Sequence, residues 1–274
     1  MNLVWGILIT IAATAVAVAA MLLVRRRAPE GSYFKDGDRA SGVFGVLATG
    51  FSILLGFVIF LVFTSYDQSR SGAETEALTV SQQIETAQFF PPSARERLTG
   101  ELICYSRSVV YGEWAKMEAG TQGDALNPWG VKLFQTLEGI APDTAAEQSA
   151  YDKWLDQTST REQARQDRIH GAVGVIPSPL WIVLLFIAGV IFVYMLFFAD
   201  SAEGAVTQAM LMGAVSSVLV VMLLLVVFLN SPFHKGVGGL RPVAMERTLR
   251  IIDQALHATG KTGQIPCDAR GNPL

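Results

Sequence analysis

Apolar residues along the chain are gathered into four long runs, none of which contains a charged side chain. The runs extend over residues 2–24, 42–64, 180–199 and 206–229. Each is close to the roughly 20 residues that a helix needs to cross the hydrocarbon core of a bilayer. Strands of a membrane barrel are much shorter, and only a helix or a closed barrel satisfies its own backbone in lipid. The pattern therefore predicts four transmembrane helices.

The segment between the second and third runs has the composition of a soluble domain and a helical pattern. Apolar residues keep helical spacing from Ser65 to Gln88, which predicts that the second helix continues beyond the bilayer until Pro91 and Pro92 end it. Ser93, with Glu96 three residues later, is expected to cap the next helix. Further helices are expected after Asn127 and over 143–169, and an amphipathic helix over 242–258.

No segment shows the period-two alternation of a β-strand. The sequence therefore predicts an all-α integral membrane protein with four transmembrane helices and a helical extramembrane domain inserted between helices 2 and 3. The expected division is into transmembrane helices 1 and 2 (1–64), the helical domain (65–178), transmembrane helices 3 and 4 (179–230), and an extramembrane tail with one amphipathic helix (231–274).

Composition supports this class and excludes others. Charged residues make up 16% of the chain, against about 25% in soluble domains. The formal net charge of −3 does not suit a nucleic-acid partner. The three histidines are scattered, and no metal-binding, phosphate-binding or nucleophile motif is present. We therefore expect no enzymatic activity, no catalytic residue, no metal site and no cofactor.

Two charge patterns bear on the orientation in the membrane. Arg25, Arg26, Arg27, Lys35 and Arg39 lie between the first two spans, and basic residues near span ends prefer the cytoplasm. They predict that the N-terminus, the 65–178 domain and the tail are external. Basic residues near span ends on the opposite side argue against this orientation: Arg70, Arg161, Arg165, Arg168, Lys235, Arg241, Arg247 and Arg250.

The two cysteines face the same compartment in either orientation, because two spans separate them. Cys104 lies in the inserted domain and Cys267 in the tail. In an oxidising compartment they would form one disulfide that ties the tail to the domain. In a reducing cytoplasm they would be two unrelated thiols.

Two charged stripes lie close to the membrane on the domain side. Asp67, Arg70 and Glu74 are spaced i, i+3, i+7 after the second span, and Arg161, Arg165 and Arg168 are spaced i, i+4, i+7 before the third. These six residues are candidates for an anion-attracting vestibule or a lipid-headgroup site. Alternatively they form ion pairs, for example between Asp67 or Glu74 and Arg165 or Arg168.

The second span carries a stripe of small residues, Gly45, Thr49, Ser52 and Gly56, and a different, bulky face that includes Ile53 and Phe57. Small stripes let helices approach closely in lipid. Alternatively, this span lines an axial path in an oligomer, and its bulky face narrows the path. None of the four runs contains an ionisable residue, which disfavours a proton-coupled or ion-coupled transporter but not a channel.

Several segments resemble the bestrophin-like domain family, a group of bacterial integral membrane proteins. The segments are 54–57 (Leu-Leu-Gly-Phe), 65–70 (Ser-Tyr-Asp-Gln-Ser-Arg), Glu74, Glu76-Ala77, 101–105 (Glu-Leu-Ile-Cys-Tyr), Glu113-Trp114, 127–130 (Asn-Pro-Trp-Gly) and Pro232-Phe233. The resemblance covers nearly the whole chain. It implies a multi-pass protein of the bacterial inner membrane.

True bestrophins are pentameric anion channels whose second span narrows the pore with bulky residues one turn apart. By that resemblance the constriction falls on Thr49, Ile53 and Phe57, of which Thr49 is not bulky. Bestrophins keep their helical domain in the cytoplasm, the reverse of what the arginines after the first span indicate.

Two functions fit these observations. The first is an oligomeric passive channel, with anions as the expected ions. The second is a non-conducting accessory protein whose 65–178 domain binds a partner complex. The expected partners are the lipid bilayer, further copies of the chain and, through the domain, another protein, but no nucleic acid.

Overall fold

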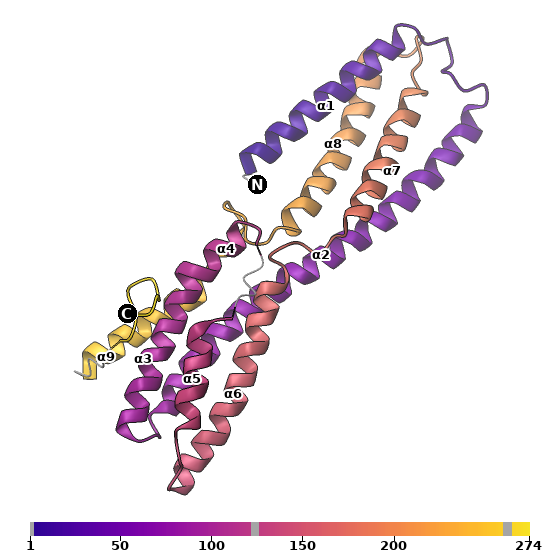
Figure 1. The fold of residues 1–274 in the computed structure, drawn as a ribbon. Coiled ribbons are helices and arrows are strands. Elements are labelled where there is room, and N and C mark those ends of the chain that lie inside the picture. The colour runs from indigo at the N-terminus through magenta and orange to yellow at the C-terminus, as the bar shows by residue number, and fades with distance from the viewer. Residues whose placement is uncertain (1–2, 122–125, 260–264) are drawn as a thin grey trace. The chain divides into compact units, whose positions relative to one another are not determined.

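The computed structural model describes residues 3–121, 126–259 and 265–274 of the chain. Within these ranges the named secondary-structure elements are all helices (Figure 1). The β-bridge between Cys267 and Pro273 is isolated and belongs to no strand. Four of the helices are long and apolar enough to cross a membrane. The expected fold class, an all-α protein with four spans and a helical domain inserted between the second and the third, is confirmed. The chain divides into two compact units, which are described separately.

The membrane unit consists of residues up to 64 together with 175–230 and 235–237. Its helices are α1 (Leu3–Arg25), the first part of α2 (Gly37–Ala87), α7 (Ser178–Leu196) and α8 (Ala205–Leu229). α1 lies beside α8 (Figure 1). Gly213 of α8 faces α1, and a Cβ atom there would make ordinary contacts with the Val18 and Thr14 side chains at 3.4 and 3.7 Å. A second apolar cluster includes Leu55 of α2 and Leu184 of α7.

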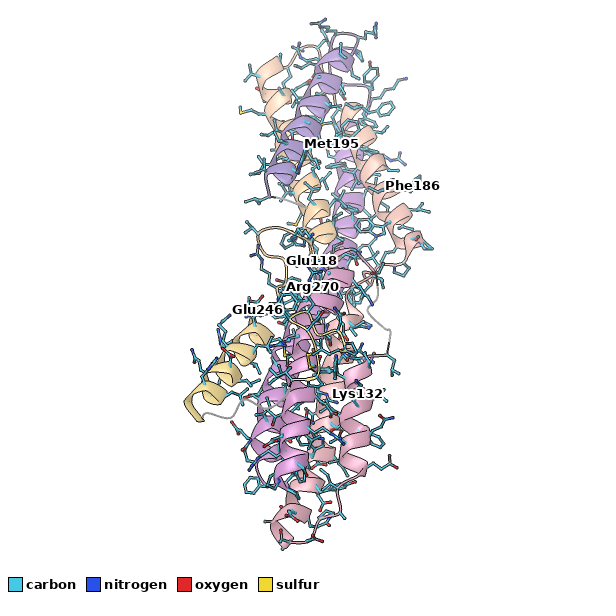
Figure 2. The ribbon with its side chains drawn as sticks, turned by 60° about the vertical axis from the view of Figure 1, so that its left-hand side comes forward. Glu118, Lys132, Phe186, Met195, Glu246 and Arg270 are labelled. Carbon is cyan, nitrogen blue, oxygen red and sulfur yellow. A yellow bond between two sulfur atoms is a disulfide. The ribbon has the colours of Figure 1, made fainter. Side chains whose placement is uncertain are left out.

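Most of the surface of these four helices is not covered within one chain. In the most apolar window of each helix, between 11% and 22% of the residues are buried. Figure 2 shows apolar side chains that project outward along the membrane unit, and Phe186 of α7 is 68% exposed. The uncovered faces are therefore available to lipid or to further chains.

The connection between α1 and α2 is held against the α7–α8 loop. The Arg25 guanidinium donates hydrogen bonds to the backbone oxygens of Ser201 (3.1 Å) and Glu203. The Phe34 ring stacks on Tyr194 with centroids 5.2 Å apart. α2 begins at Gly37, because the Asp36 carboxylate accepts a hydrogen bond from the Arg39 backbone N–H at 3.0 Å. The second apolar run begins only at residue 42, so the sequence predicts a later start for this helix than Gly37. The first turn of α2 is polar and precedes that run.

The domain unit consists of residues 65–174, 231–234 and 238–274. It contains the second part of α2, α3 (Pro92–Ser108), the π-helix η1 (Val109–Glu113), α4 (Trp114–Glu118), α5 (Pro128–Glu138), α6 (Ala145–His170) and α9 (Val243–Thr259). Its core combines aliphatic and large aromatic side chains, among them Leu98, Leu102, Leu133, Leu137, Tyr105, Trp129 and Trp154.

Gly72 sets the distance between α2 and α6. A Cβ atom at this position would lie 2.5 Å from the Arg168 backbone nitrogen and 2.7 Å from the Ala164 backbone oxygen. Real Cβ atoms do not approach backbone atoms so closely, so a side chain here would force the two helices apart. The glycine therefore allows α6 to present its side chains directly to α2.

Local sequence explains where the domain helices begin. Asn127 caps α5 by accepting the Trp129 backbone N–H, and Pro128 occupies the first turn. Thr144 and Glu147 form a reciprocal capping box at the start of α6. The expected cap at Ser93 is wrong. α3 already includes Pro92, and its N-cap is Pro91, so Ser93 lies inside the first turn.

The tail returns to the domain and is bonded to it. Cys104 of α3 and Cys267 form a disulfide with a Cα–Cα distance of 5.8 Å. Beyond it, Gly271 has a φ of +84°, and a Cβ atom there would lie 2.4 Å from the Ser108 backbone nitrogen. The buried Trp129 donates its Nε1–H to the Gly271 backbone oxygen at 2.7 Å. The C-terminal segment is therefore part of the domain.

Candidate functional site

One face of α2 in the membrane unit is uncovered. Thr49, Ile53 and Phe57 are spaced i, i+4, i+8 and are all exposed, with Ile53 at 70% and Phe57 at 61%. On the opposite face, Phe51 and Leu55 are buried. The structure thus brings the three expected pore-lining residues onto one surface that no helix within the described ranges covers.

The small residues of α2 do not pack another helix of the same chain. A Cβ atom added at Gly45 or Gly56 would meet nothing within 4 Å. Thr49 and Ser52, which complete the stripe, are exposed as well. The stripe is therefore a feature of the uncovered surface and is available to lipid or to a second chain.

The six juxtamembrane charges separate into two groups. Asp67, Arg70 and Glu74 of α2 are exposed, and Arg70 pairs with Glu74 at 3.2 Å with both side chains 61% exposed. The α6 arginines are buried instead: Arg161, Arg165 and Arg168. The two stripes do not pair with each other, because other carboxylates hold the arginines.

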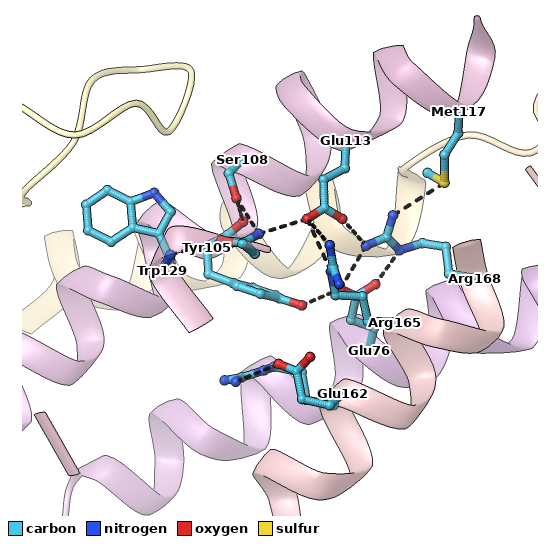
Figure 3. A network of polar contacts seen from close by, with 11 residues as sticks. Glu76, Tyr105, Ser108, Glu113, Met117, Trp129, Glu162, Arg165 and Arg168 are labelled. Carbon is cyan, nitrogen blue, oxygen red and sulfur yellow. Dashed lines mark hydrogen bonds and ion pairs between the residues drawn. The ribbon is translucent and has the colours of Figure 1, made fainter. Parts of the chain in front are cut away.

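Glu76 of α2 and Glu113 of η1 hold Arg165 and Arg168, whereas Arg161 pairs with its neighbour Glu162 at 3.2 Å. Figure 3 shows the resulting cluster. Arg168 binds Glu76 through two contacts, Nε–Oε2 at 2.5 Å and Nη2–Oε1 at 3.0 Å. The same Nη2 lies 2.6 Å from Glu113 Oε2. Arg165 Nη2 reaches Glu113 Oε1 at 3.0 Å. The cluster therefore links α2, η1 and α6.

Neutral side chains complete the cluster. The Tyr105 hydroxyl donates to Glu76 Oε1 at 2.6 Å, and Asn127 Nδ2 donates to Glu113 Oε1 at 2.9 Å. Arg161 donates to Gln83 Oε1 at 2.9 Å, and its guanidinium lies over the Tyr105 ring, 4.9 Å from the centroid. Buried carboxylates need such partners, because an unpaired charge in the interior is strongly unfavourable.

The π-helix positions Glu113 for this role. Single π-helical turns are uncommon and occur often where a side chain must be redirected for a specific purpose. Here the turn follows α3 and ends at Glu113, whose carboxylate meets both Arg165 and Arg168. The local departure from α-helical geometry therefore serves the charge cluster.

The electrostatics favour the charged forms of Glu113 and Arg168 near neutral pH. Burial alone would raise the pKa of Glu113, but the guanidinium groups of Arg168 and Arg165 outweigh burial and hold that pKa below its ordinary value. Burial likewise opposes the charge of Arg168, yet Glu76 and Glu113 raise its pKa. Burial, followed by the nearby Glu76 charge, raises the pKa of Tyr105. None of these groups is poised to exchange a proton near pH 7.

The sequence analysis found the three arginines but missed Glu76, Glu113 and Tyr105. A signal was present for Glu76, which lies beside Ala77 and four residues before Val80 on the apolar face of α2. A carboxylate on an apolar helix face requires a buried cation. No group of three or more His, Cys, Asp or Glu able to hold a metal occurs within the described ranges.

The chain has four spans, an inserted helical domain and a tail that a disulfide joins to this domain. These features define an all-α multi-pass membrane protein. The family model of the Bestrophin-like domain matches residues 11–244. The chain therefore belongs to the Bestrophin-like family, as the resemblance in its sequence predicts. No functionally curated protein matches the sequence.

Solved structures share the fold. Two are variants of a bacterial bestrophin homologue from Klebsiella pneumoniae. The first is 13% identical, with a TM-score of 0.66 and coverage of 93% of this chain and 99% of the other. The second is 15% identical, with a TM-score of 0.66 and coverage of 94% and 98%. A third, described as a membrane protein, has 14% identity, a TM-score of 0.67 and coverage of 95% and 99%. At this level of identity the likeness establishes the common fold.

Proposed function

We propose that this protein is a passive ion channel built from several copies of the chain around an axial path lined by α2. The observation that carries the proposal is the uncovered face with Thr49, Ile53 and Phe57. Apolar side chains at such positions narrow a pore and gate it by excluding water. Membership of the Bestrophin-like family supports the same assignment, and it makes anions the expected permeant ions.

The absence of charge in the spans agrees with passive conduction. None of the runs 2–24, 42–64, 180–199 and 206–229 contains Asp, Glu, Lys, Arg or His. Pumps and coupled transporters keep ionisable residues at membrane depth, because they must bind and release protons or ions there. A channel can select by backbone dipoles and constriction, without such residues.

Chloride efflux from liposomes that contain the purified protein tests this function. Wild-type protein should release chloride faster than empty liposomes, and Phe57→Ala should increase the rate because it widens the constriction. Phe186→Ala on α7 is the matched control, since Phe186 has a similar exposure in the membrane unit (68%, against 61% for Phe57) but lies outside α2. No flux above empty liposomes would overturn the channel and favour the non-conducting accessory protein.

We further propose that the N-terminus, the inserted domain and the tail face the external side of a bacterial inner membrane. The disulfide between Cys104 and Cys267 supports this orientation, because such bonds persist in oxidising compartments. Of the eight basic residues that argue against it, Arg165 and Arg168 are buried in ion pairs inside the domain and are not exposed at a span end.

A further inference from the structure

The domain unit has an open groove between α2 and α9 with a volume of about 590 Å³. Ala77, Leu240 and Ala244 supply small and apolar surface within it. Leu78 and Ile251 also line it and remain 58% and 53% exposed. Large apolar side chains left exposed together mark an interaction site.

The rim of the groove is basic. Arg241 and Arg247 line it and are exposed, whereas Arg70, on the α2 side, pairs with Glu74. The lining therefore carries three arginines and one glutamate, an excess of two positive charges. A partner that fits this groove needs an apolar side chain flanked by carboxylates.

The chain presents such a surface on α6. Asp152, Leu155, Asp156 and Ser159 are spaced i, i+3, i+4, i+7, so they share one face of the helix. All four are exposed, and Leu155 is 41% exposed between its two acidic neighbours. This acidic face complements the groove in both charge and apolar character.

The two surfaces lie on different sides of α2. α6 packs on α2 at Gly72, whereas α9 contacts it where the Thr248 hydroxyl donates to the Ala77 backbone oxygen at 3.2 Å. Gly72 and Ala77 are five positions apart, so they point in different directions around the helix. Figure 1 shows α6 and α9 flanking α2 in the domain.

We propose that the acidic α6 face of one copy occupies the α2–α9 groove of the next copy. Leu155 packs against Leu78 and Ile251, and the aspartates face Arg241 and Arg247. Because the two surfaces differ, the contact is head-to-tail. Such contacts form a ring when the rotation between copies closes, which a shared axial path requires. This inference rests on the proposed channel, since it names the partner that surrounds the shared path.

Engineered cysteines test the contact directly. The native cysteines are bonded to each other, so an added cysteine provides the only free thiol. Two differently tagged chains are co-expressed, one with Leu155→Cys and one with Ile251→Cys, and membranes are oxidised mildly. A disulfide-linked dimer that carries both tags is the expected product. Different tags ensure that the link joins two chains.

Controls make the result specific. Phe134→Cys on α5, which is 56% exposed, replaces Leu155→Cys and should give no dimer with Ile251→Cys. Asp156→Arg in the Leu155→Cys chain should lower the yield several-fold. Arg247→Asp in the Ile251→Cys chain should restore it, because the charges are then exchanged.

Four outcomes overturn the inference. Efficient dimers of Ile251→Cys alone would show a symmetric contact at the groove. An equal yield with Phe134→Cys would show random collision. If the protein conducts chloride but the cysteines at positions 155 and 251 form no link, this interface is wrong and the proposed channel still stands. If the chain is monomeric in the membrane, both the interface and the proposed channel are wrong.

Discussion

Arg168 and Glu76 form a two-point ion pair in which both side chains are completely buried. Glu76 lies on α2, the helix whose other part carries the proposed pore-lining face, and Arg168 lies on α6. Glu113 binds the same guanidinium through Nη2, the nitrogen that also contacts Glu76. Breaking such a pair from one side leaves an uncompensated charge in the interior, which is far more costly than losing an exposed pair.

Arg168→Met should therefore destabilise the protein strongly. The expected loss is about 3–5 kcal/mol, because Glu76 and Glu113 would stay buried without their shared cation. Thermal unfolding in detergent, followed by circular dichroism, measures the change. Arg70→Met is the matched control and should cost at most about 1 kcal/mol, since its pair with Glu74 is exposed. Equal effects of the two variants would contradict a structural role for the cluster.

A lowered pKa at Glu113 predicts acid sensitivity. A carboxylate whose folded-state pKa lies below its unfolded value stabilises the protein above the unfolded value of about 4.3. That contribution is lost as the pH falls through the folded-state pKa. The unfolding midpoint of the wild type should therefore drop on acidification below about pH 4, and the midpoint of Glu113→Gln should drop less. Parallel curves for the two proteins would contradict this prediction.

The contribution of Glu101 to stability should change with pH in the opposite direction to that of Glu113. Burial raises its pKa, with a hydrogen bond from Thr136 as the first opposing influence. Its ionisation therefore costs stability as the pH rises from the unfolded-state pKa through the folded-state pKa. Glu101→Gln should remove this decline, which begins near the unfolded-state pKa of about 4.3, as measured by the same midpoints. A steeper decline in the variant would be inconsistent with a raised pKa.

The four spans were predictable because an uncharged apolar run of membrane length forms few structures other than a transmembrane helix. The candidate pore residues were predictable as a group, because i, i+4, i+8 spacing places Thr49, Ile53 and Phe57 on one face of any helix. The structure adds that, in the part of the chain that it describes, no other helix covers that face. Their role in conduction remains a prediction.

The charge cluster was only half visible in the sequence. Periodicity aligned the three α6 arginines, but it gave no reason to connect them with Glu113, whose direction depends on a π-helical turn. The partners of Arg168 come from residues 92 and 55 positions away. Such contacts depend on tertiary packing, and in particular on the close approach of α2 and α6 at Gly72.

Loss of the disulfide should destabilise the domain measurably. Cys104 and Cys267 are separated by 163 positions, and closing so long a loop restricts the unfolded chain considerably. The double variant Cys104→Ala/Cys267→Ala should lose about 2–4 kcal/mol. Limited proteolysis followed by mass spectrometry should show faster cleavage within 265–274. Unchanged cleavage would mean that other contacts suffice to hold the tail.

Gly271→Ala should detach the tail without touching the disulfide. The added Cβ would meet the Ser108 backbone nitrogen at 2.4 Å and the Cys104 backbone oxygen at 2.9 Å, and the φ of +84° is unfavourable for alanine. A destabilisation of about 1–3 kcal/mol is expected from overpacking of this kind. Tryptophan fluorescence should also change, because Trp129 would lose its bond to the Gly271 oxygen. Ala269→Ser, at an exposed neighbouring position, should be neutral.

The orientation predicts which introduced cysteines can be labelled from outside intact cells. Phe134→Cys in the domain and Ala202→Cys in the α7–α8 loop each place a free thiol at an exposed position. An odd number of spans, α7 alone, separates the domain from that loop, so the two thiols face opposite compartments. A membrane-impermeant maleimide should label the first in intact cells and the second only after the cells are opened. The reverse pattern would place the domain in the cytoplasm. The disulfide would then have to persist against cytosolic reductants, which requires that burial of Cys104 and Cys267 shield it.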